Sequence, residues 1–80
     1  MEYFLGTILL LPYNFNPMGM MLCNGQTLNV AQYQALFSLI QYTYGGNGTS
    51  TFCIPNMLGQ EPGPGMNYYI VMEGLYPTRD

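Results

Sequence analysis

The 80-residue sequence contains no lysine, no histidine and no tryptophan, and it has few charged residues of either sign. One basic and four acidic residues give a net charge of −3, and charged residues make up 6% of the chain. A soluble small domain usually carries about 25–35% charged residues on its surface. Because hydrophobic residues make up 49% of this chain, we expect extensive inter-subunit packing, with further copies of the same chain covering the surface.

The shortage of positive charge excludes two classes of partner. Nucleic acids and anionic membrane surfaces are bound through several Lys or Arg side chains, and the single basic residue here is Arg79. No apolar run approaches the roughly 20 residues that a transmembrane helix needs. The apolar run at 4–11 does not read as a classical signal peptide, because Glu2 stands where positive charge belongs and no small-residue cleavage site follows. We interpret it as a buried strand.

Catalytic and metal chemistry also lack the necessary side chains. Without histidine, neither a Ser/His nor a Cys/His nucleophilic pair can form, and two cysteines alone do not complete a usual zinc site. The internal acids Glu61 and Glu73 stand beside Gly and Pro residues, where solvated surface charge is the better interpretation than a catalytic pair. We therefore expect no catalytic residue, no metal and no cofactor, and we do not expect an enzyme.

The two cysteines, Cys23 and Cys53, leave two alternatives open. Both could be buried free thiols, since Cys packs well as a small hydrophobic side chain. Alternatively, a disulfide could tie the first half of the chain to the second and constrain the unfolded state.

The pattern of residues predicts an α+β fold for a single domain spanning 1–80, with a small antiparallel β-sheet and one short helix. Strands are expected at 3–11, 20–23, 26–28, 51–54 and 67–72, and the Asn24-Gly25 dipeptide favours a hairpin between the second and third of these. The apolar spacing at 30–40 predicts a helix, with Asn29 as its N-cap. The expected core comprises Ile8, Leu10, Leu22, Leu36, Phe37, Ile40, Phe52, Ile54, Ile70 and Val71.

Four motifs follow one another at 23–26 (CNGQ), 35–40 (ALFSLI), 43–48 (TYGGNG) and 51–56 (TFCIPN). In their residues, order and spacing they resemble the phage tail collar domain family of the microcystin-dependent-protein type. The opening segment 6–19 and the closing segment 67–80 are also similar to that family. The chain is a shortened form, because the variable stretch of the family is reduced here to 58–66, and NMLGQ at 56–60 replaces the usual D-L-R-G-R.

The resemblance implies a structural, oligomeric and often trimeric element of a phage tail, located in the virion tail or an extracellular fibre. Two functions remain open: a subunit that self-assembles into a fibre-like oligomer or filament, and a receptor-binding tail-tip module that contacts a host-surface glycan or protein. Tyrosine is favoured in interfaces, where one end of the ring is apolar and the other wet. The expected interface or receptor contacts are Tyr42, Tyr44, Tyr68, Tyr69 and Tyr76.

Overall fold

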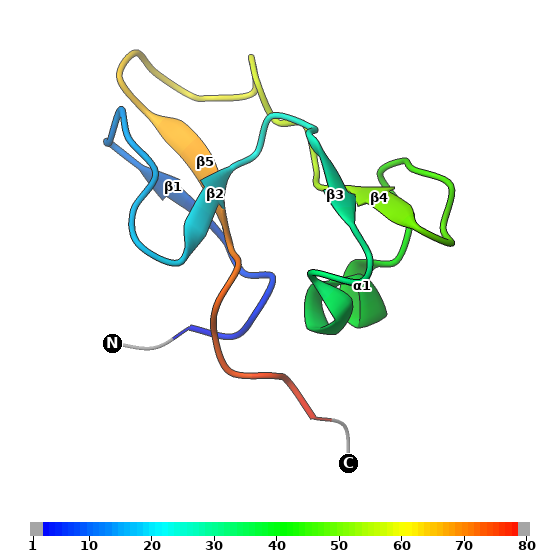
Figure 1. The fold of residues 1–80 in the computed structure, drawn as a ribbon. Coiled ribbons are helices and arrows are strands. Elements are labelled where there is room, and N and C mark those ends of the chain that lie inside the picture. Colours follow the sequence, from blue (N-terminus) through cyan, green and yellow to red (C-terminus); the bar gives the residue numbers. More distant parts are fainter. Residues whose placement is uncertain (1–2, 79–80) are drawn as a thin grey trace.

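The computed structural model describes residues 3–78, which form two small antiparallel sheets and one short helix (Figure 1). The strands are β1 (Ile8–Leu11), β2 (Met20–Leu22), β3 (Thr27–Asn29), β4 (Thr51–Cys53) and β5 (Asn67–Val71), and the helix is α1 (Gln34–Ile40). The predicted α+β class is confirmed.

The first sheet is three-stranded and has β5 in its centre, with strand order β1-β5-β2. The sequence of β5, NYYIV, is rich in the aromatic and β-branched residues that favour strands. On one side Tyr69 lies opposite Leu9 of β1, and on the other side Ile70 lies opposite Met21 of β2, both in antiparallel pairing. One sheet therefore joins the early and the late parts of the chain.

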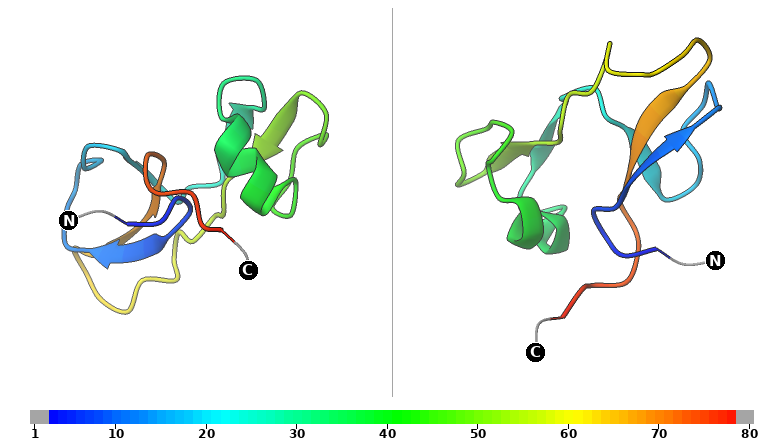
Figure 2. Two further views of the ribbon diagram at one scale, coloured as in Figure 1. Left: turned by 90° about the horizontal axis from the view of Figure 1, so that it is seen from below. Right: turned by 180° about the vertical axis from the view of Figure 1, so that it is seen from behind.

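The second sheet pairs β3 with β4, and α1 lies between these strands in the sequence. Figure 2 shows the unit of β3, α1 and β4 beside the three-stranded sheet. The two connections between the sheets contact each other, because Gly25 N–H donates to the Pro55 carbonyl (3.2 Å) and Met57 N–H to the Cys23 carbonyl (2.8 Å). Gly25 has φ +78°, and a Cβ atom there would lie 2.9 Å from Cβ of Asn56, so this approach requires glycine.

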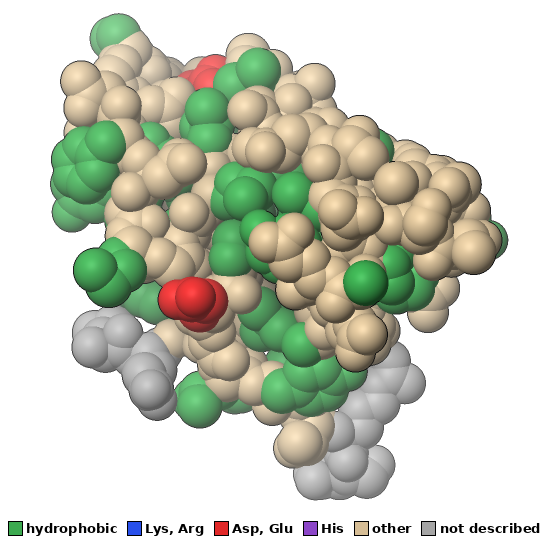
Figure 3. Space-filling model, in the orientation of Figure 1, with side chains coloured by type: hydrophobic (Ala, Val, Ile, Leu, Met, Phe, Trp, Pro, Cys, Tyr) green, Lys and Arg blue, Asp and Glu red, His purple; other side chains and the backbone are tan. Residues whose placement is uncertain are grey.

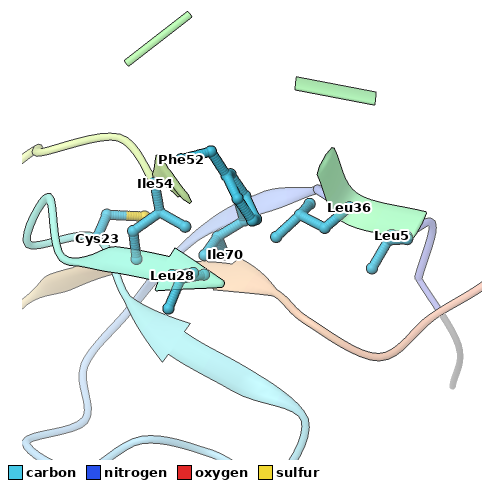
Figure 4. Packing of buried hydrophobic residues seen from close by; sticks show 7 residues of the cluster. All are labelled: Leu5, Cys23, Leu28, Leu36, Phe52, Ile54 and Ile70. Carbon is cyan, nitrogen blue, oxygen red and sulfur yellow. The ribbon is translucent and has the colours of Figure 1, made fainter. Parts of the chain in front are cut away.

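The hydrophobic core lies between the two sheets and draws residues from both of them. It contains Leu5, Cys23, Leu28, Leu36, Phe52, Ile54 and Ile70. In Figure 4, Cys23 and Ile54 lie at one end of this cluster, and Leu5 and Leu36 lie at the other. Phe52 is completely buried, and the Phe37 ring of α1 meets it edge to face, with the ring centroids 5.4 Å apart.

Half of the predicted core is fully buried, and one member of it is exposed. Leu36, Phe52, Ile54, Ile70 and Val71 are buried, whereas Leu10, Leu22, Phe37 and Ile40 are half-buried. Ile8 was wrong as a core residue, because β1 is an edge strand and leaves 37% of Ile8 exposed. Leu5, Leu28 and Tyr69 are buried although the sequence pattern did not place them in the core, and Cys23 is buried as one of the two alternatives for the cysteines had it.

The hairpin predicted at Asn24-Gly25 is wrong. β2 pairs with β5 and β3 pairs with β4, so the chain changes sheets at this dipeptide instead of reversing within one sheet. The turn signal is nonetheless real: Asn24 Oδ1 accepts a hydrogen bond from Gln26 N–H (3.2 Å). Long-range pairing with β4 and β5 overrides the local preference for a hairpin.

Two predicted elements, the first strand and the helix, are shorter than expected by four or more residues. The first strand begins at Ile8, because Gly6 takes φ +86° and the backbone before it turns to meet the late part of the chain, with Leu5 N–H bonded to the Leu75 carbonyl (2.7 Å). The helix begins at Gln34, after a Tyr33 cap position that has no side-chain cap. Asn29 is therefore not the N-cap; it ends β3, opposite Thr51.

Candidate assembly surface

The described part of the chain carries very little charge on its surface. Within residues 3–78 the charged side chains are Glu61 and Glu73. The Glu61 carboxylate accepts a hydrogen bond from Gly59 N–H (2.8 Å) in its own loop, and Glu73 is exposed beyond the end of β5. The face shown in Figure 3 has patches of hydrophobic side chains between neutral polar atoms, with two small acidic spots.

Large hydrophobic side chains are exposed on this surface in place of charge. They are Phe4, Ile8, Tyr13, Phe15, Met18, Tyr42, Tyr44, Leu58, Leu75 and Tyr76. Single exposed apolar residues are normal in proteins, so only their grouping carries information. Two groups stand out, one around the end of α1 and the other on the loop between β1 and β2.

The first group, here called the α1-end surface, comprises Ser38, Leu39, Tyr42, Tyr44 and Tyr76. The Tyr76 and Ser38 hydroxyl oxygens lie 2.6 Å apart in a hydrogen bond, which fixes the segment after β5 against the helix. The Tyr42 ring lies on the backbone of Gly48, where an added Cβ would come within 2.7 Å of Tyr42 Cδ1. The two rings are 59% (Tyr42) and 49% (Tyr76) exposed, so they are held in place while their outer faces remain free.

The loop that presents Tyr42 and Tyr44, here called the braced loop (41–50), is held together by hydrogen bonds to the Asn47 side chain. Asn47 Oδ1 accepts hydrogen bonds from the backbone N–H groups of Thr49, Ser50 and Thr51 at 2.8, 2.8 and 3.0 Å. The close approach of Gly46 to β4 leaves no room for a side chain, because a Cβ there would lie 2.4 Å from Cα of Phe52. The TYGGNG motif therefore forms a well-ordered support for this loop.

The second group lies on the loop between β1 and β2. Tyr13 and Phe15 stack with their ring centroids 5.3 Å apart and an interplanar angle of 19°. The Tyr13 carbonyl accepts hydrogen bonds from Asn67 Nδ2 (2.9 Å) and the Tyr69 hydroxyl (2.7 Å), which ties this loop to β5. Met18 is 98% exposed at the far part of the same loop.

Three of the five tyrosines expected to make contacts are exposed in the structure. Tyr42, Tyr44 and Tyr76 are exposed around the end of α1. Tyr68 is half-buried and packs against the core. Tyr69 is wrong as a contact residue, because it is 2% exposed on the central strand and its hydroxyl is already hydrogen-bonded within the chain. The exposed Tyr13, Phe15 and Met18 were missed because a loop gives no periodic signal.

Both cysteines are free thiols in the structure. Cys23 lies in the core, and burial raises the pKa of its thiol from 9.0 to about 11. Cys53 alternates with the core residue Phe52 along β4, so its side chain points to the opposite face of the strand. There its Sγ lies 3.4 Å from the Thr27 hydroxyl. This geometry opposes a disulfide between the two residues, and thiol counting remains the direct test.

Two further properties of residues 3–78 concern clustered metal ligands and long apolar helices. Within 3–78, no three His, Cys, Asp or Glu side chains gather as potential metal ligands. No helix in the same part of the chain is long and apolar enough to cross a membrane. The distinctive property of this surface is its neutral, aromatic character.

Comparison with known proteins agrees with the motifs that build this fold. The family model described as Phage Tail Collar Domain matches residues 6–62, which include β1, the α1 helix and the braced loop at 41–50. No curated protein and no solved structure matches the chain. The match covers more than half of the 80 residues, and the chain therefore belongs to the phage tail collar domain family, a structural family of phage tail fibres that is not a family of enzymes.

Proposed function

We propose that this chain is a structural subunit that self-assembles into a tail-fibre-like oligomer or filament. One observation carries the proposal: the described surface exposes ten large hydrophobic side chains and has only two charged ones, Glu61 and Glu73. Interfaces between subunits are enriched in Tyr, Phe and Met and depleted in Lys, Glu and Asp. Assembly would remove this apolar surface from water, which is the dominant favourable term in protein association.

The rigidity of the α1-end surface supports the same proposal. Side chains that are already held in one place lose little conformational entropy when a partner covers them. Tyr42 lies on Gly48, and Tyr76 is hydrogen-bonded to Ser38. We propose that this surface is one of the contacts between copies, located in the virion tail or in an extracellular fibre.

The test is the mass of the native protein and of three lysine variants, measured by light scattering after size-exclusion chromatography. Tyr44→Lys and Gln34→Lys place a charge on the α1-end surface and on the exposed side of α1, respectively. An unpaired lysine buried between copies is strongly unfavourable, so Tyr44→Lys should reduce the assembled mass. Gln34→Lys should do the same if the exposed side of α1 is covered as well, and an unchanged mass would remove that side from the interface. Gln60→Lys introduces the same charge in the loop of Glu61 and is the matched control. A wild-type mass equal to one chain at all concentrations would refute the proposal.

The braced loop at 41–50 also favours a second function, a receptor-binding tail-tip module. A rigid loop that presents two exposed tyrosines is suited to contacting a host-surface glycan or protein. The two functions differ in the assembled state. In a tip, Tyr42 and Tyr44 stay accessible to iodination after assembly, whereas in a building block they become protected.

A further inference from the structure

The hydrogen bonds of β5 fix which way each backbone group of the three-stranded sheet points. Tyr68 C=O accepts from Cys23 N–H (3.0 Å) and Met72 N–H donates to the Gly19 carbonyl (2.7 Å), so the even-numbered residues face β2. Val71 N–H donates to the Thr7 carbonyl (2.9 Å), so the odd-numbered residues face β1. Successive residues of a strand alternate in this way along the whole sheet.

The backbone groups of β1 follow from this alternation and from its register. Leu9 lies opposite Tyr69 and Leu11 opposite Asn67, so the N–H and C=O groups of Leu9 and Leu11 point toward β5. Those of Ile8 and Leu10 point away from the sheet, because β1 is its edge. Within residues 3–78, no further strand or loop is hydrogen-bonded to this edge.

The four residues of this edge carry no charge and no proline, although the strand is short and lies between a bulge at Gly6–Thr7, where Gly6 N–H and Thr7 C=O both bond to Val71, and Pro12. Natural edge strands are protected by lysine or other charges, by proline, by bulges or by a covering segment. β1 reads ILLL and contains none of these residues, and proline occurs only after the strand, at Pro12. The edge therefore offers four unpaired backbone groups with apolar side chains around them.

We infer that β1 pairs antiparallel with β1 of a second copy, so that two three-stranded sheets join into one six-stranded sheet across a two-fold axis at Leu9. The inference rests on the proposed self-assembly and names one of its contacts. A second copy satisfies this edge, because the outward N–H and C=O groups of two antiparallel β1 strands pair with each other. Two copies also bring no like charges together, since the strand is uncharged.

One register satisfies all four outward groups at once. When Ile8 of one copy lies opposite Leu10 of the other, each residue pair exchanges two N–H···O bonds, as in a hydrogen-bonded antiparallel pair. The symmetry repeats this exchange on the other side of the axis, where Leu10 meets Ile8. The two Leu9 residues then form the non-hydrogen-bonded pair at the axis.

The same pairing accounts for the exposure of Ile8. Its side chain lies on the sheet face of Ile70, yet it remains 37% exposed in the single chain. In the paired sheet it would contact Leu10 of the other copy, and directly opposite apolar side chains stabilise a sheet. This contact closes after two copies, so a longer oligomer needs a second surface such as the α1-end surface.

Proline variants test the contact with a matched control at the opposite edge. Leu10→Pro removes an outward N–H from β1 and no bond within the sheet, and proline is tolerated at such edge positions. Leu22→Pro makes the same change in β2, where the Leu22 N–H also points away from β5. Leu10→Pro removes two hydrogen bonds per dimer, so we expect it to raise the dissociation constant of the dimer by at least about tenfold. We expect Leu22→Pro to leave this dissociation constant unchanged.

Cysteine cross-linking tests the register without weakening the contact. In the proposed register two Leu9→Cys residues face each other at a Cα separation of about 4.5 Å, which suits a disulfide. Two Leu11→Cys residues lie on the same face but about 13 Å apart along the strands. Mild oxidation should therefore give a reducible dimer with Leu9→Cys and none with Leu11→Cys.

The outcomes distinguish the β1 contact from the more general proposal of self-assembly. If the wild type assembles while Leu10→Pro assembles equally well and Leu9→Cys does not cross-link, the β1 contact is wrong and self-assembly stands. If circular dichroism shows that Leu10→Pro does not fold, the cross-linking of Leu9→Cys compared with Leu11→Cys tests the β1 contact instead. If the wild type never exceeds the mass of one chain, self-assembly and the β1 contact are both refuted.

Discussion

Phe52 is the core side chain whose truncation should destabilise the fold most. It is completely buried, and it belongs to the cluster that joins the two sheets. It lies opposite Leu28 on the neighbouring strand, and its ring meets that of Phe37 on α1 edge to face. Replacing it with alanine removes the ring from the centre of the core. Because a small domain has few other core residues, the cavity has little chance to be filled by rearrangement.

The expected cost of Phe52→Ala is about 4 kcal/mol, since buried Phe→Ala substitutions cost roughly 3–5 kcal/mol. A chain of this length has a free energy of unfolding of about 4–12 kcal/mol, so the variant should lose a third or more of its stability. For an m-value of about 1.3 kcal/mol/M, the urea midpoint should fall by roughly 3 M. Phe37→Ala should cost less, about 2 kcal/mol, because Phe37 is half-buried.

Urea unfolding followed by circular dichroism at one fixed protein concentration measures these changes. The matched control is Phe15→Ala, which makes the same chemical change at a side chain that is 61% exposed and should cost less than about 1 kcal/mol. A Phe37/Phe52 double-mutant cycle should give a coupling of about 0.5–1.5 kcal/mol for the edge-to-face pair. A Phe52→Ala midpoint equal to that of the wild type would show that the two sheets do not share this core.

Four further predictions concern local features. Gln41 ends α1 with φ +51° and ψ −141°, so Gln41→Gly should raise the free energy of unfolding by about 1 kcal/mol, and a lower thermal midpoint would contradict this. Asn47→Ala removes three hydrogen bonds to the loop backbone, so it should cost about 2 kcal/mol and speed amide exchange at residues 49–51. Burial raises the pKa of the Cys23 thiol to about 11. The contribution of the neutral thiol to stability is therefore fully present below about pH 9, and it is lost as the pH rises through about 11. Urea midpoints measured across that pH range should show this loss. At pH 8, two thiols should react with a thiol reagent in urea and Cys23 should be protected in the native state, whereas a disulfide would leave none to react.

The regular elements with strong local patterns were predictable from the sequence. The β5 segment NYYIV and the TFC segment of β4 combine high strand propensity with flanking Gly and Pro, and the structure has both strands within a residue of the expected bounds. The face of Leu36, Phe37 and Ile40 predicted the side of α1 that packs against the core. Local propensity and burial agree in these segments, so either alone identifies them.

Strand pairing was not predictable in the same way. The Asn24-Gly25 dipeptide is a strong hairpin signal, but Cys23 bonds to Tyr68 and Gly25 to Pro55, both far away in the sequence. The exposure of Ile8 depends likewise on which strand lies at the edge of the sheet, and no local pattern contains that information. The burial of Tyr69 follows from the same cause, because only the strand order places β5 in the centre.

The sequence indicated that the surface is uncharged and rich in tyrosine, but it did not indicate where the tyrosines lie in space. The shortage of charge and the abundance of tyrosine predicted an interface, and Tyr42, Tyr44 and Tyr76 are exposed in the single chain. The position of Tyr76 beside α1 depends on its hydrogen bond to Ser38, which is 38 residues away in the sequence. A pairing over this distance requires the three-dimensional structure.

The mass of the purified native protein tests the central claim most directly. Light scattering across a hundredfold range of concentration, combined with electron microscopy of the same sample, measures whether the uncharged surface is covered by sister chains. Self-assembly predicts a mass of several 9.0 kDa chains and particles of defined width. A folded, freely soluble species of one chain at every concentration would contradict it.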